Sequence, residues 1–323
     1  MLKFLNKNIT FQWVILLGLF GFSLYEIFTK SQVADAEGTA FLFKNFKLLF
    51  SNHQFLGKVI IIIIIILKIV CLQYFFRKNE LATKNNLLPS VFYFSILLIT
   101  KSLTTISPFF FTSFFFLIII CIEIAENSKT IKNNVLWAGI LIALATCFDF
   151  SSIILLFLLM VTLFINQFSS MKEIGILWFG FTLFYFYLFS FNFFVDHLGE
   201  WKLSFQQLSI LGVLNSAIIN EPKKLVALII LGILYLFFVV KFKLLSESKV
   251  VIHRKRIATL NTRALLLLIC IFISNSTYPA VFGYLSVPVS IYLAMLVQEK
   301  SQRWITNDVI AIITLTTFVI LWL

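Results

Sequence analysis

The chain has 323 residues, of which 60% are hydrophobic and 12% are charged, and its mean hydropathy is +1.00. Soluble domains carry roughly a quarter charged residues, so this composition excludes an ordinary soluble fold and predicts a protein embedded in lipid. The net charge of +12 does not indicate nucleic-acid binding, because membrane proteins concentrate Lys and Arg in cytoplasmic loops. The sequence contains no Walker loop, glycine-rich dinucleotide motif, HExxH or CxxC.

Apolar segments recur along the whole chain. A spanning helix needs about 20 mostly apolar residues, and by this rule the sequence predicts about eleven spans. They are 11–28, 57–76, 88–106, 108–125, 134–150, 151–167, 174–195, 223–240, 264–278, 280–297 and 306–323. Because the loops are short, residues 1–323 are expected to form a single integral membrane domain, an all-α bundle.

Two short polar stretches decide this count. Lys101–Pro108 and Asp149–Ser152 are each expected to form a tight hairpin between two spans. If either stretch were not a turn, two helices would merge and the topology downstream would invert.

The distribution of basic residues predicts the orientation. With a cytoplasmic N-terminus, 17 Lys and Arg lie on the inner side and 8 on the outer side, and Lys68 lies within the second span. The positive-inside rule therefore favours a cytoplasmic N-terminus and an outward C-terminus. The expected location is a bacterial inner membrane.

The first span also resembles a signal peptide, because Lys3 and Lys7 precede it and Ala34-x-Ala36 resembles a cleavage site. Its apolar core is longer than the roughly 7–15 residues of a signal peptide, which favours an uncleaved helix.

Three loops are long enough to have a role. The outer loop 29–56 contains AFLFKNFKLLF, in which Phe43, Phe46 and Phe50 recur at helical spacing beside lysines, as in a short helix that lies at the membrane surface. The outer loop 196–222 is partly apolar, and the basic inner loop 241–263 is expected to contact anionic headgroups.

Acidic residues on the outer side are the candidates for chemistry, because ionisable groups near the membrane are energetically costly. Asp35 and Glu37 could supply a general base or a metal ligand, or form only a polar loop tip. Asp149, at a turn between two spans, could line a cleft or cap the next helix.

The sequence identifies no cofactor. A bound divalent metal ion is one alternative, because Asp196, His197 and Glu200 lie close together in the sequence of the outer loop. Against it, no second histidine stands at the spacing of a metal motif. A solvated loop end is the more common alternative.

The late spans contain two proline breaks, at Tyr278-Pro279 and at Pro288, which could line a cavity or merely kink a helix. The four cysteines, all in apolar runs, are expected to be buried rather than bridged.

The order of these features resembles the GT-C type of polytopic glycosyltransferase. A first span leads to an outer loop with Asp35-x-Glu37 and an amphipathic segment, and a second span, a basic inner loop and a hairpin at Ser107-Pro108 follow. The Trp137–Phe164 stretch is similar to the fifth and sixth helices of that family.

The resemblance covers roughly residues 1–170 and implies an enzyme that uses a polyprenyl-linked sugar. Asp35 or Glu37 would then be the base, and Asp149 would form a second wall of the cleft. The donor phosphate would bind basic and aromatic outer residues, for which the candidates are Lys101, Lys202, Lys223, Lys224 and Tyr278.

Three functions remain open on the sequence. The first is a transferase acting on a polyprenyl-phosphate sugar, and the second is a non-catalytic subunit or scaffold of an envelope complex that binds other membrane proteins. The third is a transporter, which the lack of an inverted repeat and of charges deep in the spans, apart from Lys68, disfavours.

Overall fold

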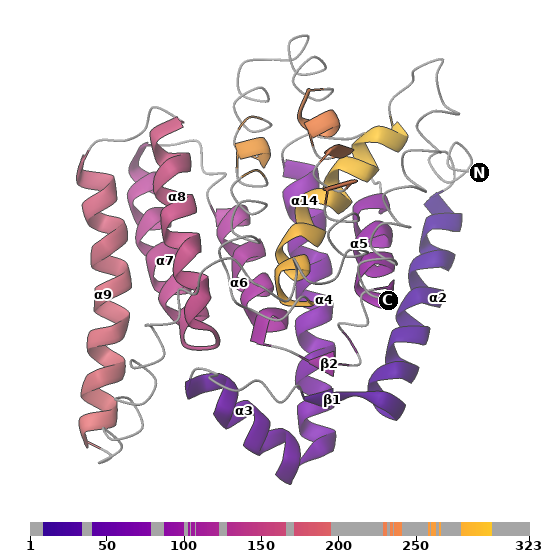
Figure 1. Cartoon of the computed structure of the whole chain (residues 1–323), viewed down its shortest axis with the longest axis horizontal. Helices are drawn as coiled ribbons and strands as arrows, with labels where there is room; N and C mark the ends of the chain where they lie inside the picture. The colour runs from indigo at the N-terminus through magenta and orange to yellow at the C-terminus, as the bar shows by residue number, and fades with distance from the viewer. Residues whose placement is uncertain are drawn as a thin grey trace.

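The computed structural model describes residues 9–33, 41–78, 87–99, 103, 105–106, 108–122, 128–165, 171–194 and 279–298, together with isolated helical residues within 229–240 and 258–265. This part of the chain is almost entirely helical (Figure 1). Its longer helices are α2 (Ile9–Lys30), α3 (Phe41–Asn52), α4 (Gln54–Lys78), α5 (Leu88–Ile99), α6 (Pro108–Ile122), α7 (Ser128–Thr146), α8 (Ile154–Ile165), α9 (Met171–Phe194) and α14 (Pro279–Gln298).

Three of the described helices, α2, α4 and α9, are long and apolar enough to cross a membrane. Helices α5, α6, α7, α8 and α14 contain shorter apolar stretches. Each of these eight helices overlaps a predicted span. Helix α5 ends at Ile99, several residues before the predicted end of span 88–106. The predicted spans 223–240 and 264–278 are described only in part, and 306–323 lies outside the described residues.

Both predicted interruptions are present. Helix α5 ends at Ile99 and α6 begins at Pro108, so the two predicted spans form separate helices. Helix α7 ends at Thr146 and is followed by a turn at residues 147–149, the short 3-10 helix η1 (Phe150–Ile153) and then α8. We call residues 147–149 the Asp149 turn.

Two very short strands were not predicted. Strand β1 (Gln32–Val33) pairs in parallel with β2 (Thr105–Ile106), with Gln32 opposite Thr105 and Val33 opposite Ile106. Strand β1 follows the end of α2 and β2 stands just before α6, and their pairing gives hydrogen-bond partners to backbone groups that lie outside the helices. Ile106 is fully buried at this point.

The helices pack side by side, and α3 lies across one end of the bundle, the lower end in Figure 1. Helices α7 and α9 approach very closely through glycines. A Cβ atom on Gly139 would lie 2.4 Å from the Leu177 carbonyl oxygen, and one on Gly180 would lie 2.4 Å from that of Leu136. Small residues let backbones meet in this way where lipid supplies no hydrophobic force between helices.

Candidate functional site

Helix α3 forms the floor of the candidate site at the lower end of Figure 1. Phe43, Phe46 and Phe50 share its buried face, as their spacing predicts, and the lysines between them are exposed. The Phe face packs against protein. The Phe46 ring lies 4.6 Å from that of Phe111 in α6, and Phe111 stacks on Phe148 at 4.8 Å, measured between ring centroids.

A backbone hydrogen bond attaches the start of α3 to the Asp149 turn. The Leu42 amide donates to the Cys147 carbonyl oxygen at 3.0 Å. Cys147 is buried, so its thiol packs in the protein interior, as the sequence predicts for the cysteines. Cys71 and Cys121 are also free thiols, each half-buried.

Asp149 is held in the turn through its backbone. Its amide donates to the Ala145 carbonyl oxygen at 3.0 Å, and its carbonyl oxygen accepts from the Ser152 amide at 3.0 Å. The residue is half-buried and stands directly before η1, which is the position of a helix cap. Both interpretations of Asp149 from the sequence, cap and cleft wall, are compatible with this position.

The chain that leads toward Asp35 is attached at this end as well. Val33, the last residue of β1, pairs with Ile106 just before α6. Lys58 in α4 donates from its ammonium group to the Phe28 carbonyl oxygen at 2.8 Å, which ties the end of α2 to the start of α4.

Glu26 in α2 is not among the candidate residues predicted from the sequence. Its Oε2 atom is buried and has no hydrogen-bond partner within the part of the chain that the structure describes. A buried carboxylate oxygen without a hydrogen-bond partner raises the free energy of the folded state. Glu26 is therefore, with Asp149, a second candidate acidic residue at the end of the bundle that carries α3.

Of the site residues predicted from the sequence, only Asp149 belongs to the described part. The other candidate residues lie outside the described part of the chain; they are Asp35, Glu37, Lys101, Lys202, Lys223, Lys224, Tyr278, Asp196, His197 and Glu200. That Asp35 and Glu37 face Asp149, and that the basic residues bind a phosphate, therefore remain predictions.

Lys68 in α4 is fully buried within one of the described helices that are long enough to cross a membrane. Its side chain is 0% exposed, its Nζ donates to Ser113 Oγ at 2.9 Å, and it lies 3.8 Å from the centre of the Phe110 ring. The buried side chains of Tyr93 and Ser286 add to the polar groups of the interior. The sequence shows a lysine in an apolar run, but only the fold identifies its partners.

The described residues offer carboxylates rather than a metal cage. No three His, Cys, Asp or Glu side chains among them are close enough to hold a metal ion. A carboxylate such as Asp149 can accept a proton or a hydrogen bond from a hydroxyl group, which is the chemistry that the arrangement allows.

Comparison of the chain with protein-family models, with curated proteins and with solved structures found no match.

Proposed function

We propose that the chain is a multi-pass protein of a bacterial inner membrane that transfers a sugar from a polyprenyl-phosphate donor at its outer face. The end of the bundle that carries α3 and the Asp149 turn forms the site. Asp35 or Glu37 takes the proton from the acceptor hydroxyl as its oxygen bonds to the sugar, while polyprenyl phosphate leaves. Asp149 forms the opposite wall.

The hydrogen bond from Leu42 to Cys147 carries this proposal. It joins the start of α3, which follows the Asp35-x-Glu37 segment in the chain, to the turn that contains Asp149. Two regions about a hundred residues apart in sequence, each singled out for its acids, are therefore attached to each other. A resemblance based on order alone did not require this attachment.

The β1–β2 pairing supports the same arrangement from the other side of the segment. Residues 34–40 follow Val33, which is paired with Ile106, and precede Leu42, which is bonded to Cys147. Both flanks of the segment that carries the proposed base are thus attached to the same end of the bundle.

The alternative function, a non-catalytic subunit of an envelope complex, is favoured by α9. This helix stands at the edge of the described bundle (Figure 1). It exposes many aromatic side chains. They include Phe179, Phe186, Tyr187, Phe191 and Phe194. Such a face suits either lipid or a neighbouring membrane protein.

Single substitutions of the acids distinguish the two functions. Asp35→Asn, Glu37→Gln and Asp149→Asn are compared with the unaltered protein at equal protein level, by growth and by the profile of envelope glycans. Loss of the general base should slow transfer by about 100-fold or more, because that is the usual contribution of such a group.

Glu173→Gln at the start of α9 is the matched control, because it removes a half-buried carboxylate from the opposite end of the bundle. It should leave the glycan profile unchanged. Normal behaviour of all three site variants would rule out the catalytic function and leave the scaffold.

A further inference from the structure

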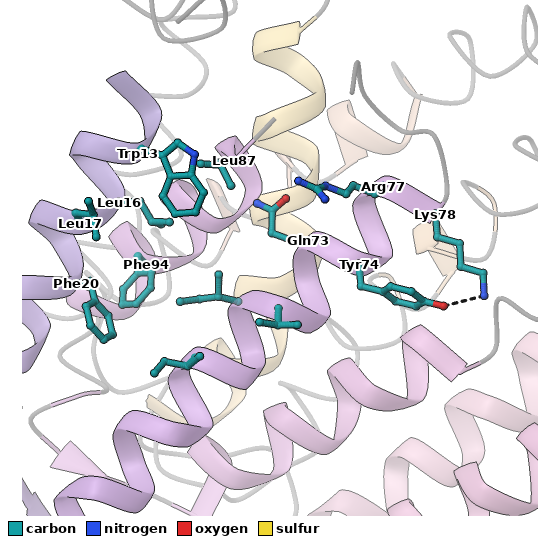
Figure 2. A pocket seen from close by; sticks show the side chains of 13 residues that line it. Trp13, Leu16, Leu17, Phe20, Gln73, Tyr74, Arg77, Lys78, Leu87 and Phe94 are labelled. Carbon is teal, nitrogen blue, oxygen red and sulfur yellow. Dashed lines mark hydrogen bonds between the residues drawn. The ribbon is translucent and has the colours of Figure 1, made fainter. Parts of the chain in front are cut away.

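A groove of about 780 Å³ lies between α2, α4 and α5 (Figure 2). It reaches the C-terminal end of α4, away from α3. Its volume falls in the range of about 300–1,000 Å³ that is typical of sites for small molecules. Most of its wall is apolar, with Leu16 and Phe20 from α2, Ile69 from α4 and Phe94 from α5. This wall suits a hydrocarbon chain.

One end of the groove is polar and cationic. Gln73, Tyr74, Arg77 and Lys78, all from the last turns of α4, line it there. The Lys78 ammonium group donates to the Tyr74 hydroxyl at 3.0 Å, as Figure 2 shows, and the Arg77 side chain is exposed. Two cations and no acid are among the residues that line the groove.

Contacts between α2 and its neighbours hold the groove open in advance of any ligand. Gln12 Oε1 accepts a hydrogen bond from the Leu87 amide at 2.8 Å, which fastens α2 to the start of α5. The Phe20 and Phe94 rings meet edge to face at 6.2 Å. Because α2 is braced against α5 in this way, a ligand need not create the groove, which lowers the cost of binding.

The length of the groove matches one leaflet of a bilayer. Ile66 and Lys78 are twelve residues apart in α4, and at 1.5 Å per residue this spans about 18 Å. Half of a hydrocarbon core of about 30 Å is about 15 Å. A chain that begins at Arg77 therefore ends near the middle of the membrane.

We propose that this groove binds an anionic phospholipid of the inner leaflet, with an acyl chain along α2 and α4 and the phosphate at Arg77 and Lys78. The guanidinium group of arginine pairs with phosphate through two parallel hydrogen bonds, and basic pockets between helices on the cytoplasmic side are suited to anionic headgroups. The topology predicted from the basic residues places Arg77 and Lys78 on that side. This lipid site is separate from the proposed sugar-transfer site and does not depend on it.

Lipid binding to the purified full-length protein tests the proposal. Native mass spectrometry compares dioleoyl phosphatidylglycerol with dioleoyl phosphatidylcholine, which differ in net charge and not in their chains. The phosphatidylglycerol should bind at least tenfold more tightly to the unaltered protein. The double variant Arg77→Gln/Lys78→Gln should lose this preference and keep its binding of phosphatidylcholine.

Lys132→Gln/Lys172→Gln is the matched control for charge, because both lysines are exposed and lie outside the groove, on the side predicted to be cytoplasmic. Leu17→Trp fills the groove and should weaken both lipids, whereas Val14→Trp places the same bulk on an exposed position of α2 that does not line it.

Equal binding of the two lipids by the unaltered protein would overturn the proposal. So would an equal loss of preference in the Lys132/Lys172 control, a loss of both lipids in the Arg77/Lys78 variant, or equal effects of the two tryptophans. A polyprenyl phosphate that binds more tightly than phosphatidylglycerol would overturn the assignment of the occupant.

Discussion

Lys68 shows how a spanning helix accommodates a buried lysine. A lysine at the centre of such a helix costs about 2.5–3.5 kcal/mol on insertion scales. Here the amino group has a hydroxyl partner in Ser113 and lies over the face of the Phe110 ring at 3.8 Å. A buried polar group that keeps a hydrogen-bond partner costs less than one that has none.

This arrangement predicts opposite results for the two partners of the hydrogen bond. Lys68→Met keeps an unbranched chain of similar length and removes the buried polar amino group, so the free energy of unfolding should stay the same or rise. Ser113→Ala leaves that amino group buried without its hydroxyl partner and should lower the free energy of unfolding by about 1–3 kcal/mol. Denaturation of the purified variants in detergent measures both. A large loss of stability in Lys68→Met would contradict this account.

At the scale of elements, the glycines of α7 and α9 set the distance between the two helices. Gly180 lies where any side chain would meet the backbone of α7, whereas a Cβ on Gly175 in the same helix would have no atom within 4 Å. The two glycines lie in the same helix and differ in how closely they pack against α7, so substitutions at them separate the effect of packing from that of helix propensity.

Gly180→Ala should therefore destabilise the protein by about 1–3 kcal/mol, because the helices must separate to admit the methyl group. Gly175→Ala should have no such effect, and the helix propensity of alanine favours it by up to about 1 kcal/mol. Thermal unfolding of the two variants beside the unaltered protein measures the difference. Equal shifts would show that the close approach of α7 and α9 contributes little.

At the scale of the whole molecule, the orientation of the bundle connects both proposals. The proposed transfer site must face outward, and the cationic end of the lipid groove must lie on the cytoplasmic side. The described helices are consistent with this division, because α3 and the Asp149 turn share one end of the bundle and the C-terminal end of α4 lies at the other (Figure 1). Arg77 and Lys78 are in the last turn of α4.

Cysteine labelling in intact cells tests this orientation. Lys44→Cys lies on the exposed face of α3 and should react with a membrane-impermeant maleimide, whereas Lys172→Cys at the start of α9 should react only after the membrane is opened. The native Cys147 should stay unlabelled, because its side chain is buried and the reagent cannot reach it. The reverse pattern would invert the topology and exclude an outward-facing site.

Features that are local to one helix could be predicted from the sequence. The lengths of the apolar runs predicted the described helices, and the spacing of Phe43, Phe46 and Phe50 predicted that they share one face of α3. The sequence assigned this face to the membrane surface, and the structure packs it against protein. Pro108 and the polar residues around Asp149 predicted the interruptions before α6 and α8. These features depend on hydrophobic length, helical period and backbone restriction, which act between near neighbours in sequence.

Contacts between segments that are distant in the chain could not be predicted from the sequence. The sequence alone determined a helical membrane protein with an amphipathic helix after its first span. The tertiary structure decided that α3 is bonded to the Asp149 turn, that β1 pairs with β2, that Glu26 Oε2 is buried and that α2, α4 and α5 leave a groove. Helices of uniformly apolar composition carry little information about which neighbour each one meets, so packing shape and a few buried polar groups make that choice.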